Sequence, residues 1–425
     1  MKGRRILYVC HRSWPYMGGA ERHFWEWAKR TSEEGNKVTI MTTDAWDIQR
    51  FHDPSARRIE PRSEYVEGIH VIRFPIRYAP RAIRPGLFSA LRMIPGRCFP
   101  HAFAHPEILL PGYWLAMALG RKRYDLVHAG LFPHLFLMAP AIAYARRHRI
   151  PLAATPLAHL GEPFRPPGKQ HDYLTDRHTS LLKKCGLVTC NTDIEREALI
   201  ERGVPPNLLR VIGPGISPEK TAGGNAAHFR KKFKICGPIV LQISTQTHDK
   251  GSHHIVEAMK ALWARGSNAT LVLVGQLLRD FEYYLAGQPA EVFEKTFVLN
   301  YIDEQTKLDA LAACDVFVMP SRADSFGIVF LEAWRYKKPV IGALAGGIPG
   351  VITHGEDGLL VPFGDTHMLI ETLQEILQCP PLGRALGENG YRKLVKQHTW
   401  ERSCSRLQEE YDRLLERHEA ASNRD

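Results

Sequence analysis

Short, uninterrupted apolar runs alternate with helix-sized segments along almost the whole chain of 425 residues. Such runs are typical of strands covered on both faces, and the segments between them carry apolar residues at helical spacing. The runs are 6–10, 37–43, 69–74, 124–130, 150–156, 187–191 and 209–215, then 239–245, 270–275, 296–301, 315–321, 339–344 and 358–363. This alternation predicts an α/β fold with parallel sheets that have helices on both faces.

The alternation is interrupted once, which suggests two domains. Residues 217–237 are polar and Gly-rich, as a linker would be. We therefore expect an N-terminal Rossmann-like domain over 1–215 and a C-terminal Rossmann-like domain over 216–395. The segment 396–425 should form a helix that packs back across the domain junction. Two doubly wound domains of this kind would face a cleft at the carboxyl ends of their strands.

Composition and cysteine usage exclude several classes of protein. No apolar run reaches the roughly 18 residues that a membrane-spanning helix needs. The first residues lead directly into a strand-like run without the apolar core of a signal peptide. The 8 cysteines include no CxxC pair, which favours reduced thiols over a disulfide or zinc framework. These features predict a cytoplasmic protein.

The positive charge is concentrated in the first half. Residues 1–214 hold 32 Lys and Arg against 19 Asp and Glu, and the remainder holds 24 against 26. The densest segment, 73–123, has a single acid, Glu107, and interleaves arginines with apolar residues such as Phe88 and Trp114. It is either a solvated basic surface or a surface for an anionic partner, and we expect peripheral contact with the inner face of a membrane. The acidic second half argues against a nucleic-acid partner.

A glycine turn follows the first predicted strand. Gly18 and Gly19 open a helix there, so backbone N–H groups and the helix N-terminus could approach an anion. The alternative is a tight turn without a ligand. The turn lacks the GxGxxG pattern, which weakens the interpretation as a dinucleotide-dependent oxidoreductase.

Two acids lie around the start of another predicted helix. Asp324 follows the run 315–321, and Glu332 lies among apolar residues within the helix 328–336. Asp324 or Ser325 is expected to cap this helix, which leaves the backbone N–H groups of 325–328 available to an anion or a hydroxyl. The alternative is a simple cap and a surface acid. An acid in apolar surroundings usually has a partner, which favours a functional pair.

Taken together, several segments resemble glycosyltransferase family 4, whose members are retaining enzymes of the GT-B fold that use nucleotide sugars. The resemblance rests on GGAERH (18–23), DKG (249–251), the segments 300–334 and 338–352, and DGLLVPFGD (357–365). It spans nearly the whole chain and is most specific over 300–365. It implies a transferase in glycoconjugate biosynthesis with no metal or other cofactor, because a nucleotide-sugar donor is the substrate and a sugar or lipid-linked hydroxyl is the acceptor.

The resemblance also implies roles for individual residues. Asp324 would lie by the donor sugar and Glu332 would bind the nucleotide ribose. Lys250 would bind the diphosphate, with the Gly18–Gly19 turn beside the donor phosphates. The donor-binding positions implied in this way are Gly18, Gly19, Thr245, Lys250, Tyr301, Ile302, Ser325, Phe326, Gly327, Ile328, Val329 and Glu332.

Three positions depart from the family pattern. Asp324 stands where Glu is usual and is one methylene shorter, and Thr245 stands where a second diphosphate-binding Arg is usual. Gly350 stands where an acid is common. The family's active-site histidine has three candidates, His128, His134 and His159, because the expected position holds Gly130.

We therefore expect a retaining, metal-independent glycosyltransferase in which Asp324, Glu332 and Lys250 carry the reaction. Lys250 and backbone N–H groups would stabilise the departing diphosphate. The alternative is a non-catalytic relative that binds a sugar nucleotide or a glycan, for which Thr245 and Asp324 are the motivating departures.

Overall fold

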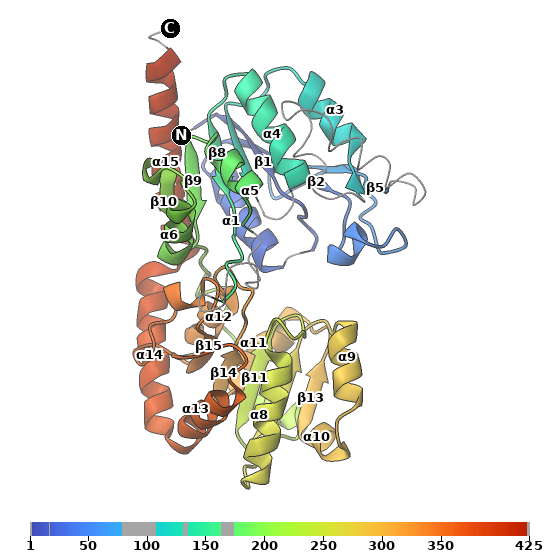
Figure 1. Ribbon diagram of the computed structural model, residues 1–425, viewed down its shortest axis with the longest axis vertical. Helices are drawn as coiled ribbons and strands as arrows, with labels where there is room; N and C mark the ends of the chain where they lie inside the picture. Colours follow the sequence, from blue (N-terminus) through green and yellow to red (C-terminus); the bar gives the residue numbers. More distant parts are fainter. Residues whose placement is uncertain (1, 17, 79–107, 131–134, 163–173, 423–425) are drawn as a thin grey trace. The chain divides into compact units, whose positions relative to one another are not determined.

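The computed structural model describes residues 2–16, 18–78, 108–130, 135–162 and 174–422 (Figure 1). The chain divides into two compact units. Unit 1 comprises Met1–Ala158, Tyr173–Ile212 and Ser403–Asp425, and unit 2 comprises His159–Asp172 and Gly213–Arg402. The sequence placed the divisions after 215 and 395, whereas the structure has them after 212 and 402 and adds the segment 159–172 to unit 2. That last difference follows from long-range contacts that no local pattern encodes.

Unit 1 is built on an eight-stranded sheet with the order β10-β9-β8-β7-β1-β2-β4-β3. Its strands pair in parallel except at the β3–β4 hairpin. The strands are β1 (Arg5–Val9), β2 (Lys37–Thr43), β3 (Ser63–Val66), β4 (Ile69–Phe74), β7 (Leu126–Gly130), β8 (Leu152–Thr155), β9 (Leu187–Cys190) and β10 (Leu209–Val211). A separate two-stranded sheet joins β5 (Arg77–Tyr78) to β6 (Ile108–Leu109).

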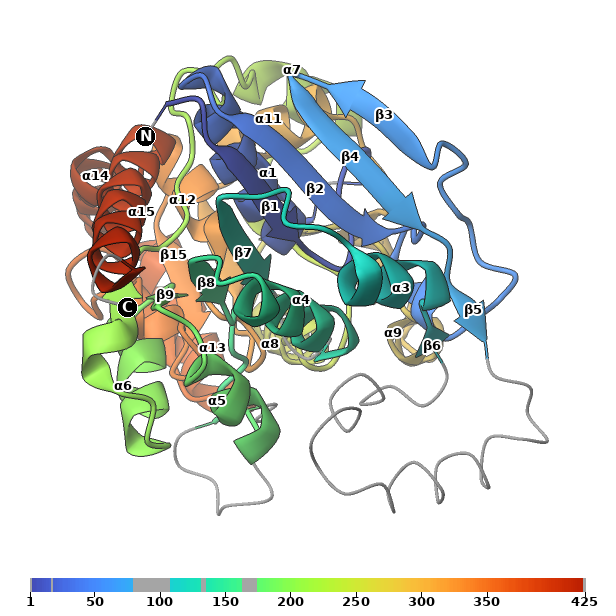
Figure 2. The same ribbon diagram turned by 90° about the horizontal axis from the view of Figure 1, so that it is seen from above.

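Helices cover both faces of this sheet. Figure 2 shows α3 and α4 on one face and α1 on the other. Trp27 of α1 donates from its indole nitrogen to Ser403 of α15 at 2.9 Å, so the C-terminal helix lies beside α1 within unit 1. The helices of unit 1 are α1 (Gly19–Glu33), α3 (Pro111–Leu119), α4 (Leu135–Arg147), α5 (Asp176–Leu182), α6 (Asp193–Glu201) and α15 (Trp400–Ser422), with short 3₁₀ turns η1 (Ile48–Phe51) and η2 (Pro206–Leu208).

The edge hairpin of unit 1 was not predicted. In β3 the side chains alternate between exposed and half-buried, without the continuous apolar run of the central strands. Glu67 and Gly68 connect β3 to β4 and both have positive φ, as a two-residue hairpin turn requires. A polar edge strand of this kind leaves little signal in the sequence.

Unit 2 is built on a six-stranded parallel sheet with the order β13-β12-β11-β14-β15-β16. The strands are β11 (Ile239–Ile243), β12 (Thr270–Val274), β13 (Thr296–Leu299), β14 (Val316–Met319), β15 (Val340–Ala343) and β16 (Leu359–Val361). The helices are α7 (Ala226–Phe233), α8 (Ser252–Ala264), α9 (Arg279–Ala286), α10 (Ala290–Glu294), α11 (Glu304–Ala313), α12 (Ile328–Arg335), α13 (Thr366–Gln378) and α14 (Pro380–Gln397), with the 3₁₀ turn η3 (Ile348–Gly350). The two Rossmann-like domains predicted from the sequence are thus confirmed.

The sheet of unit 2 separates two apolar cores, because neighbouring residues of a strand point to opposite faces. Val240 of β11 packs with α8, α9 and α13, whereas Leu241 packs with α7, α11 and α12. The segment 217–237, which the sequence suggested to be a linker, contains helix α7. Phe229 and Ile235 of this segment are buried in the second core, with Ala226 and Phe233 packed against it, and these apolar contacts outweigh the polar composition of the segment.

The helices of the described residues include no candidate for a membrane span. None of them combines the length and the apolar character that crossing a bilayer requires.

Candidate active site

The candidate residues of unit 2 gather where the direction of chain winding reverses. From β11 the chain proceeds through β12 and β13 on one side, and β14 begins on the other side of β11. Loops that follow β11 and β14 therefore diverge and leave room at the carboxyl edge, which is where ligands bind in doubly wound folds. Lys250 follows β11 and Asp324 follows β14, so the topology alone brings these two residues together.

Lys250 and Asp324 form an ion pair. The Lys250 ammonium donates to Oδ2 of Asp324 at 2.8 Å, and the two side chains are 24% and 17% exposed. Burial by itself would raise the pKa of the Asp324 carboxyl, but the charge and hydrogen bond of Lys250, with help from Ser321, lower that pKa below its usual value. The site therefore holds a carboxylate and an ammonium that a ligand can reach.

The Asp324 loop is fixed by close packing against a glycine turn that follows β15, Gly346–Gly347. Gly347 donates its backbone N–H to the carbonyl of Asp324 at 2.8 Å. A Cβ on Gly347 would lie 2.0 Å from the carbonyl oxygen of Ser325, and one on Gly346 would lie 2.3 Å from that of Asp324. Only glycine allows this approach, so the turn after β15 positions the loop that carries the acid.

Helix α12 begins later than the sequence suggested. Its N-cap is Gly327, in the left-handed conformation with φ of 85°, rather than Asp324 or Ser325. The prediction of a side-chain cap was wrong because the loop from Asp324 to Phe326 is held by the glycine turn and leads into the helix through a conformation that favours glycine. Among the described residues, the N–H groups of Phe326 and Gly327 donate to no protein acceptor. Donors of this kind, with the positive end of the α12 dipole, suit an anion.

Glu332 lies on the buried side of α12. It is 3% exposed, and Lys307 of α11 donates to its Oε1 at 3.0 Å. Lys307 also contacts Glu304 at 2.9 Å. The sequence predicted that Glu332 has a partner but did not identify Lys307, which lies 25 positions away on another helix. The pair can offer a carboxylate oxygen to a ligand hydroxyl while keeping its charge compensated.

Three other predicted donor-site residues lie at the same edge of the sheet. Tyr301 and Ile302 follow β13, and the Tyr301 side chain is 74% exposed. Thr245 follows β11 and is exposed. The large aromatic side chain of Tyr301 is accessible at the end of a strand, so a planar group could stack on it.

Arg322 is a buried cation that the sequence reasoning missed. It donates to Oδ1 of Asp249 from Nη2 at 2.6 Å and from Nε at 3.0 Å, and to Glu162 from Nη1 at 3.4 Å. Its guanidinium also lies 4.9 Å from the ring centroid of Phe363. Since Asp249 immediately precedes Lys250, this network holds the Lys250 loop against the Asp324 loop. The sequence signal that could have identified Arg322 is its position two residues before Asp324.

The three candidate histidines differ in their surroundings. His128 is fully buried in unit 1, where its Nδ1 bonds to the Tyr411 hydroxyl and its Nε2 bonds to Thr155 at 2.6 Å. Burial lowers the pKa of His128 to about 3, so it is a neutral core residue. His134 lies outside the described residues.

His159 is the candidate that lies beside the paired charges of unit 2. Burial, and then the nearby charge of Lys250, lower the pKa of its imidazole to about 4. The segment that carries it is fixed at Gly161, whose carbonyl accepts from the Gly346 N–H at 2.8 Å. His159 is therefore neutral near pH 7 and able to accept a hydrogen bond from a hydroxyl.

The glycine turn of unit 1 follows β1. From β1 the chain passes to β2 on one side, and β7 lies on the other side of β1, so the loops that follow β1 and β7 separate there. Gly18 is the N-cap of α1 and Gly19 its first residue. A Cβ on Gly18 would lie 2.5 Å from Glu21 Oε2. Glu21 is itself buried and pairs with Arg12 at 2.7 Å and with His11 at 3.2 Å. Although burial favours the neutral acid, these partners lower the pKa of Glu21 to about 2, so a carboxylate fixes the turn from inside the helix.

In the described ranges, no three His, Cys, Asp or Glu side chains gather where they could hold a metal ion. The described groups of the candidate site are carboxylates, an ammonium, a guanidinium and backbone N–H donors.

Comparison with known families gives a match to each half of the chain. Residues 17–220 match the family described as glycosyltransferase family 4, and residues 226–393 match the glycosyl transferases group 1.

Among curated proteins, the chain is 31% identical over 187 residues to a GDP-mannose-dependent monoacylated alpha-(1-6)-phosphatidylinositol monomannoside mannosyltransferase from Corynebacterium glutamicum. It is 27% identical over 234 residues to a D-inositol 3-phosphate glycosyltransferase from Saccharomonospora viridis. These alignments cover 42% and 52% of this chain, and the chain spans about half of the length of each relative, 48% and 54%.

A solved structure covers the chain more fully. The complex of HepE from Anabaena with UDP and glucose superposes with a TM-score of 0.69 at 18% identity, over 96% of this chain and 99% of that one. This likeness shows a shared fold over both units.

Proposed function

Since this chain belongs to the family 4 glycosyltransferases, we propose that it transfers a sugar from a nucleotide-diphosphate donor to a hydroxyl acceptor with retention of configuration. The observation that carries the proposal is the Lys250–Asp324 ion pair beside the N-terminus of α12. A diphosphate needs cations and N–H donors, and a sugar needs a carboxylate for its hydroxyls. Both kinds of group lie here within one edge of a sheet.

The donor would be held by groups from three loops. Lys250 and the N–H groups of Phe326 and Gly327 would bind the diphosphate, and Asp324 would orient the sugar through its hydroxyls. Glu332, paired with Lys307, would accept hydrogen bonds from the ribose. HepE is a neighbour in fold whose solved complex contains UDP and glucose, which supports a nucleotide-sugar donor for this chain.

Transfer would break the bond between the anomeric carbon and the diphosphate oxygen, with the electron pair leaving on the diphosphate. Lys250 and the backbone donors would stabilise that charge as it develops, and they cost no reorganisation because they are already in place. The acceptor oxygen would bond to the same face of the sugar, and its proton would pass to the departing phosphate oxygen. No metal ion is required in this scheme, because the ammonium and the peptide N–H groups neutralise the leaving group.

His159 would act on the hydroxyls near the reacting centre. Its lowered pKa keeps the imidazole neutral, so that it can accept a hydrogen bond without competing with Lys250 for the anion. Arg322 would keep the Lys250 and Asp324 loops together through Asp249 rather than contact the donor, since its guanidinium is already bonded to two acids.

The test of the proposed function is binding followed by turnover. UDP, GDP or ADP should raise the melting temperature of the protein, and the base giving the largest shift identifies the donor series, because a ligand that binds the folded state stabilises it. Nucleotide sugars of that base should then yield a glycosylated product. A stabilising shift without turnover on any donor would instead support the non-catalytic sugar-nucleotide-binding alternative, which the departures at Thr245 and Asp324 favour.

We further propose that the acceptor is lipid-linked or otherwise anionic and that the protein binds the cytoplasmic membrane surface through the segment 73–123. Most of this segment lies outside the described residues. In its described part, α3 exposes Leu115 and Leu119, which are 59% and 73% exposed and one helical turn apart. Exposed Arg121, Lys122 and Arg123 follow, as in interfacial helices. Arg73 does not contribute, because it is buried and bonded to Glu64 at 2.6 Å.

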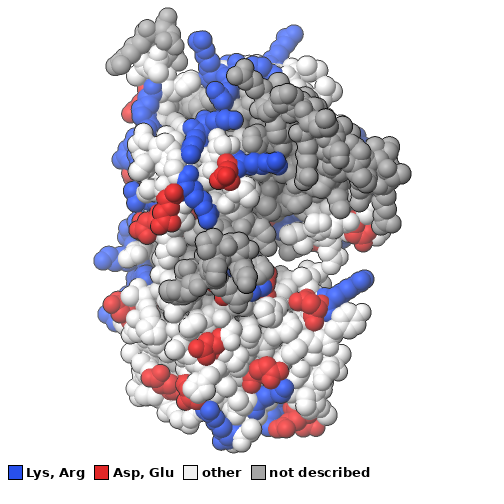
Figure 3. All heavy atoms as spheres, viewed as in Figure 1, with Lys and Arg blue, Asp and Glu red and all other residues white. Residues whose placement is uncertain are grey.

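The charges visible in unit 1 agree with this proposal. On the face that Figure 3 shows, Lys and Arg side chains outnumber acids over unit 1, whereas unit 2 displays both signs. The Corynebacterium relative is named for an acylated phosphatidylinositol mannoside, and an acceptor of that chemical type would suit such a surface.

Membrane binding is tested by sedimentation. The full chain should sediment with phosphatidylglycerol vesicles at low salt, should stay in solution with phosphatidylcholine vesicles, and should be released at roughly 0.5 M salt, where charges are screened within a few ångströms. Leu115→Ser with Leu119→Ser should weaken sedimentation, whereas Tyr283→Ser, at an exposed position of unit 2, should not. Equal sedimentation of both variants would exclude α3 from the contact.

A further inference from the structure

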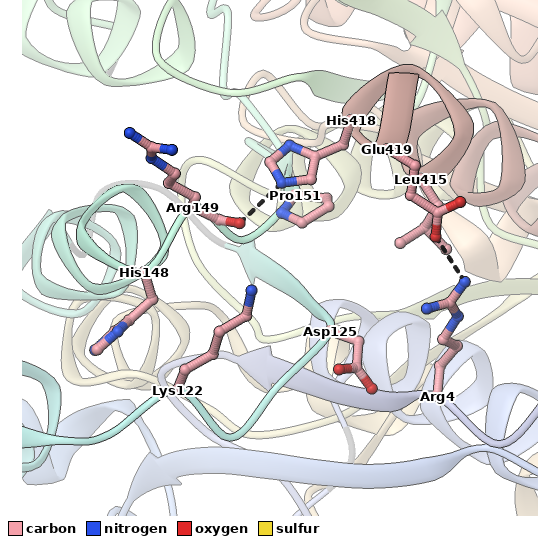
Figure 4. Close-up of a pocket in the computed structure, with 9 residues that line it drawn as sticks. All are labelled: Arg4, Lys122, Asp125, His148, Arg149, Pro151, Leu415, His418 and Glu419. Atoms are coloured by element: carbon pink, nitrogen blue, oxygen red, sulfur yellow. Dashed lines mark hydrogen bonds and ion pairs between the residues drawn. The ribbon is translucent and has the colours of Figure 1, made fainter. Parts of the chain in front are cut away.

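A cavity of about 520 Å³ lies in unit 1 at the edge of the sheet where the strands begin (Figure 4). Arg4 precedes β1, Lys122 and Asp125 precede β7, and Arg149 precedes β8. Glu419 and His418, on the last turns of α15, complete the wall. Four chain segments distant in sequence thus converge on one hollow.

This cavity is separate from the glycine turn of unit 1. Gly18 and Gly19 follow the carboxyl end of β1, whereas Arg4 lies at its amino end. β1 spans five residues, so its two ends are about 13 Å apart. A ligand in the cavity would therefore occupy the opposite edge of the sheet from the predicted phosphate contact of that turn.

The acids of the cavity are already neutralised by the protein. Asp125 accepts from the Arg5 backbone N–H and from Arg5 Nη2, both at 2.8 Å, and these bonds lower the pKa of its carboxyl. Glu419 accepts from Arg4 Nη2 at 2.9 Å. Since both carboxylates are satisfied within the wall, they present little free negative charge to a ligand.

The remaining cations have no such counter-ion. Among the residues that the structure describes, neither Lys122 nor Arg149 pairs with an acid. In Figure 4 the Lys122 ammonium points into the space bounded by Asp125, Pro151 and His418. His418 bonds through Nε2 to the carbonyl of Arg149 at 2.8 Å, which ties the backbone that carries the second cation to α15. The lining thus carries surplus positive charge, with the Lys122 ammonium directed into the cavity and the Arg149 guanidinium turned outward at its rim in Figure 4.

We propose that this cavity binds a phosphate-bearing anion, held by Lys122 and Arg149. Its volume lies within the range of roughly 300–1,000 Å³ typical of small-molecule sites. The polar, cationic wall favours a compact oxyanion over an apolar ligand, and lysine and arginine are the side chains that bind phosphate best. The phosphate could belong to a free metabolite or to a lipid headgroup. This site does not depend on the donor site of unit 2.

The experiment titrates inorganic pyrophosphate into the full chain by calorimetry, in a Lys250→Ala background that removes the proposed diphosphate contact. Adding Lys122→Ala and Arg149→Ala should weaken binding about tenfold or more, a loss of roughly 1.4 kcal/mol or more. The matched control adds Lys231→Ala and Lys396→Ala, which remove the same charge from exposed positions of unit 2 and should leave the affinity unchanged.

A second arm identifies the source of the phosphate. The protein is sedimented with phosphatidylglycerol and with phosphatidylcholine vesicles. Because Lys122 also lies in the proposed membrane segment 73–123, the vesicle arm uses Arg149→Ala alone, with Lys231→Ala as its control. Loss of pyrophosphate binding in the cavity variant assigns the site to a free phosphate compound, and weaker binding of Arg149→Ala confined to phosphatidylglycerol vesicles assigns it to a lipid headgroup. If the cavity variants and their controls behave alike in both arms, the proposal is overturned. If the alanine variants are unstable in thermal melting, Lys122→Gln with Arg149→Gln replaces the double variant in calorimetry, and Arg149→Gln replaces the single variant in sedimentation.

Discussion

Replacing Lys250 with alanine should lower kcat/KM for the nucleotide-sugar donor by about a hundredfold or more. A unit charge at about 4 Å from a phosphate oxygen is worth roughly 4 kcal/mol at an effective dielectric of 20, and each 1.4 kcal/mol of lost transition-state stabilisation is about tenfold in rate. The loss should fall mainly on kcat, because the leaving group gains charge only as the bond breaks. Initial rates at varied donor concentration measure it.

The control is Lys260→Ala on α8. Lys260 contacts Glu257 at 3.0 Å and lies away from the Asp324 loop, so its loss removes the same charge without touching the proposed site. Both variants should melt as cooperatively as the natural protein. If Lys250→Ala and the control Lys260→Ala both turn over at near-normal rates, the leaving group is stabilised by residues other than Lys250.

The second large effect is expected at Glu332. Glu332→Ala should reduce kcat/KM by about a hundredfold, because a hydrogen bond to a charged group contributes roughly 1.5–3 kcal/mol and its loss also leaves the Lys307 ammonium without its buried partner. The stabilising thermal shift given by the nucleoside diphosphate should disappear, whereas a free-sugar contact would leave that shift intact. Thermal melting with and without nucleotide, together with initial rates, measures both parts.

Two further variants separate ribose binding from simple destabilisation. Lys307→Met should lower stability by removing the counter-ion of Glu332 but should retain part of the nucleotide affinity, since the carboxylate remains. Glu371→Ala, which breaks an exposed ion pair with Arg265, should change neither property. If Glu332→Ala loses melting temperature but binds nucleotide as the natural protein does, the assignment to the ribose is incorrect.

The sequence predicted the fold because its strongest local signals come from buried parallel strands. Each of the apolar runs overlaps a strand of one of the two sheets, and most intervals between those strands hold an α-helix. β3 and α7 were missed for one reason, which is that each contributes few apolar residues to a core. In α7 the residues that pack on the core are Ala226, Phe229 and Phe233, and of these only Phe229 is buried.

The sequence could predict only those parts of the candidate site that follow from strand order or from family motifs. Lys250 and Asp324 follow neighbouring strands, so parallel pairing brings them together. Arg322 with Glu162, and Glu332 with Lys307, are pairings over long sequence separations that only the folded chain defines. The histidines show the same limit, since His128 and His159 look alike in sequence and differ only in what surrounds them.

The contact between Gly346–Gly347 and the Asp324 loop has a practical consequence for engineering. Because the atoms in contact belong to the main chain, no change of rotamer can make room for a larger residue at either glycine. A library intended to alter donor preference should therefore keep both glycines and randomise Thr245 and Tyr301 instead. Both side chains are exposed, at positions proposed to contact the donor, so their exchange should not displace the acid.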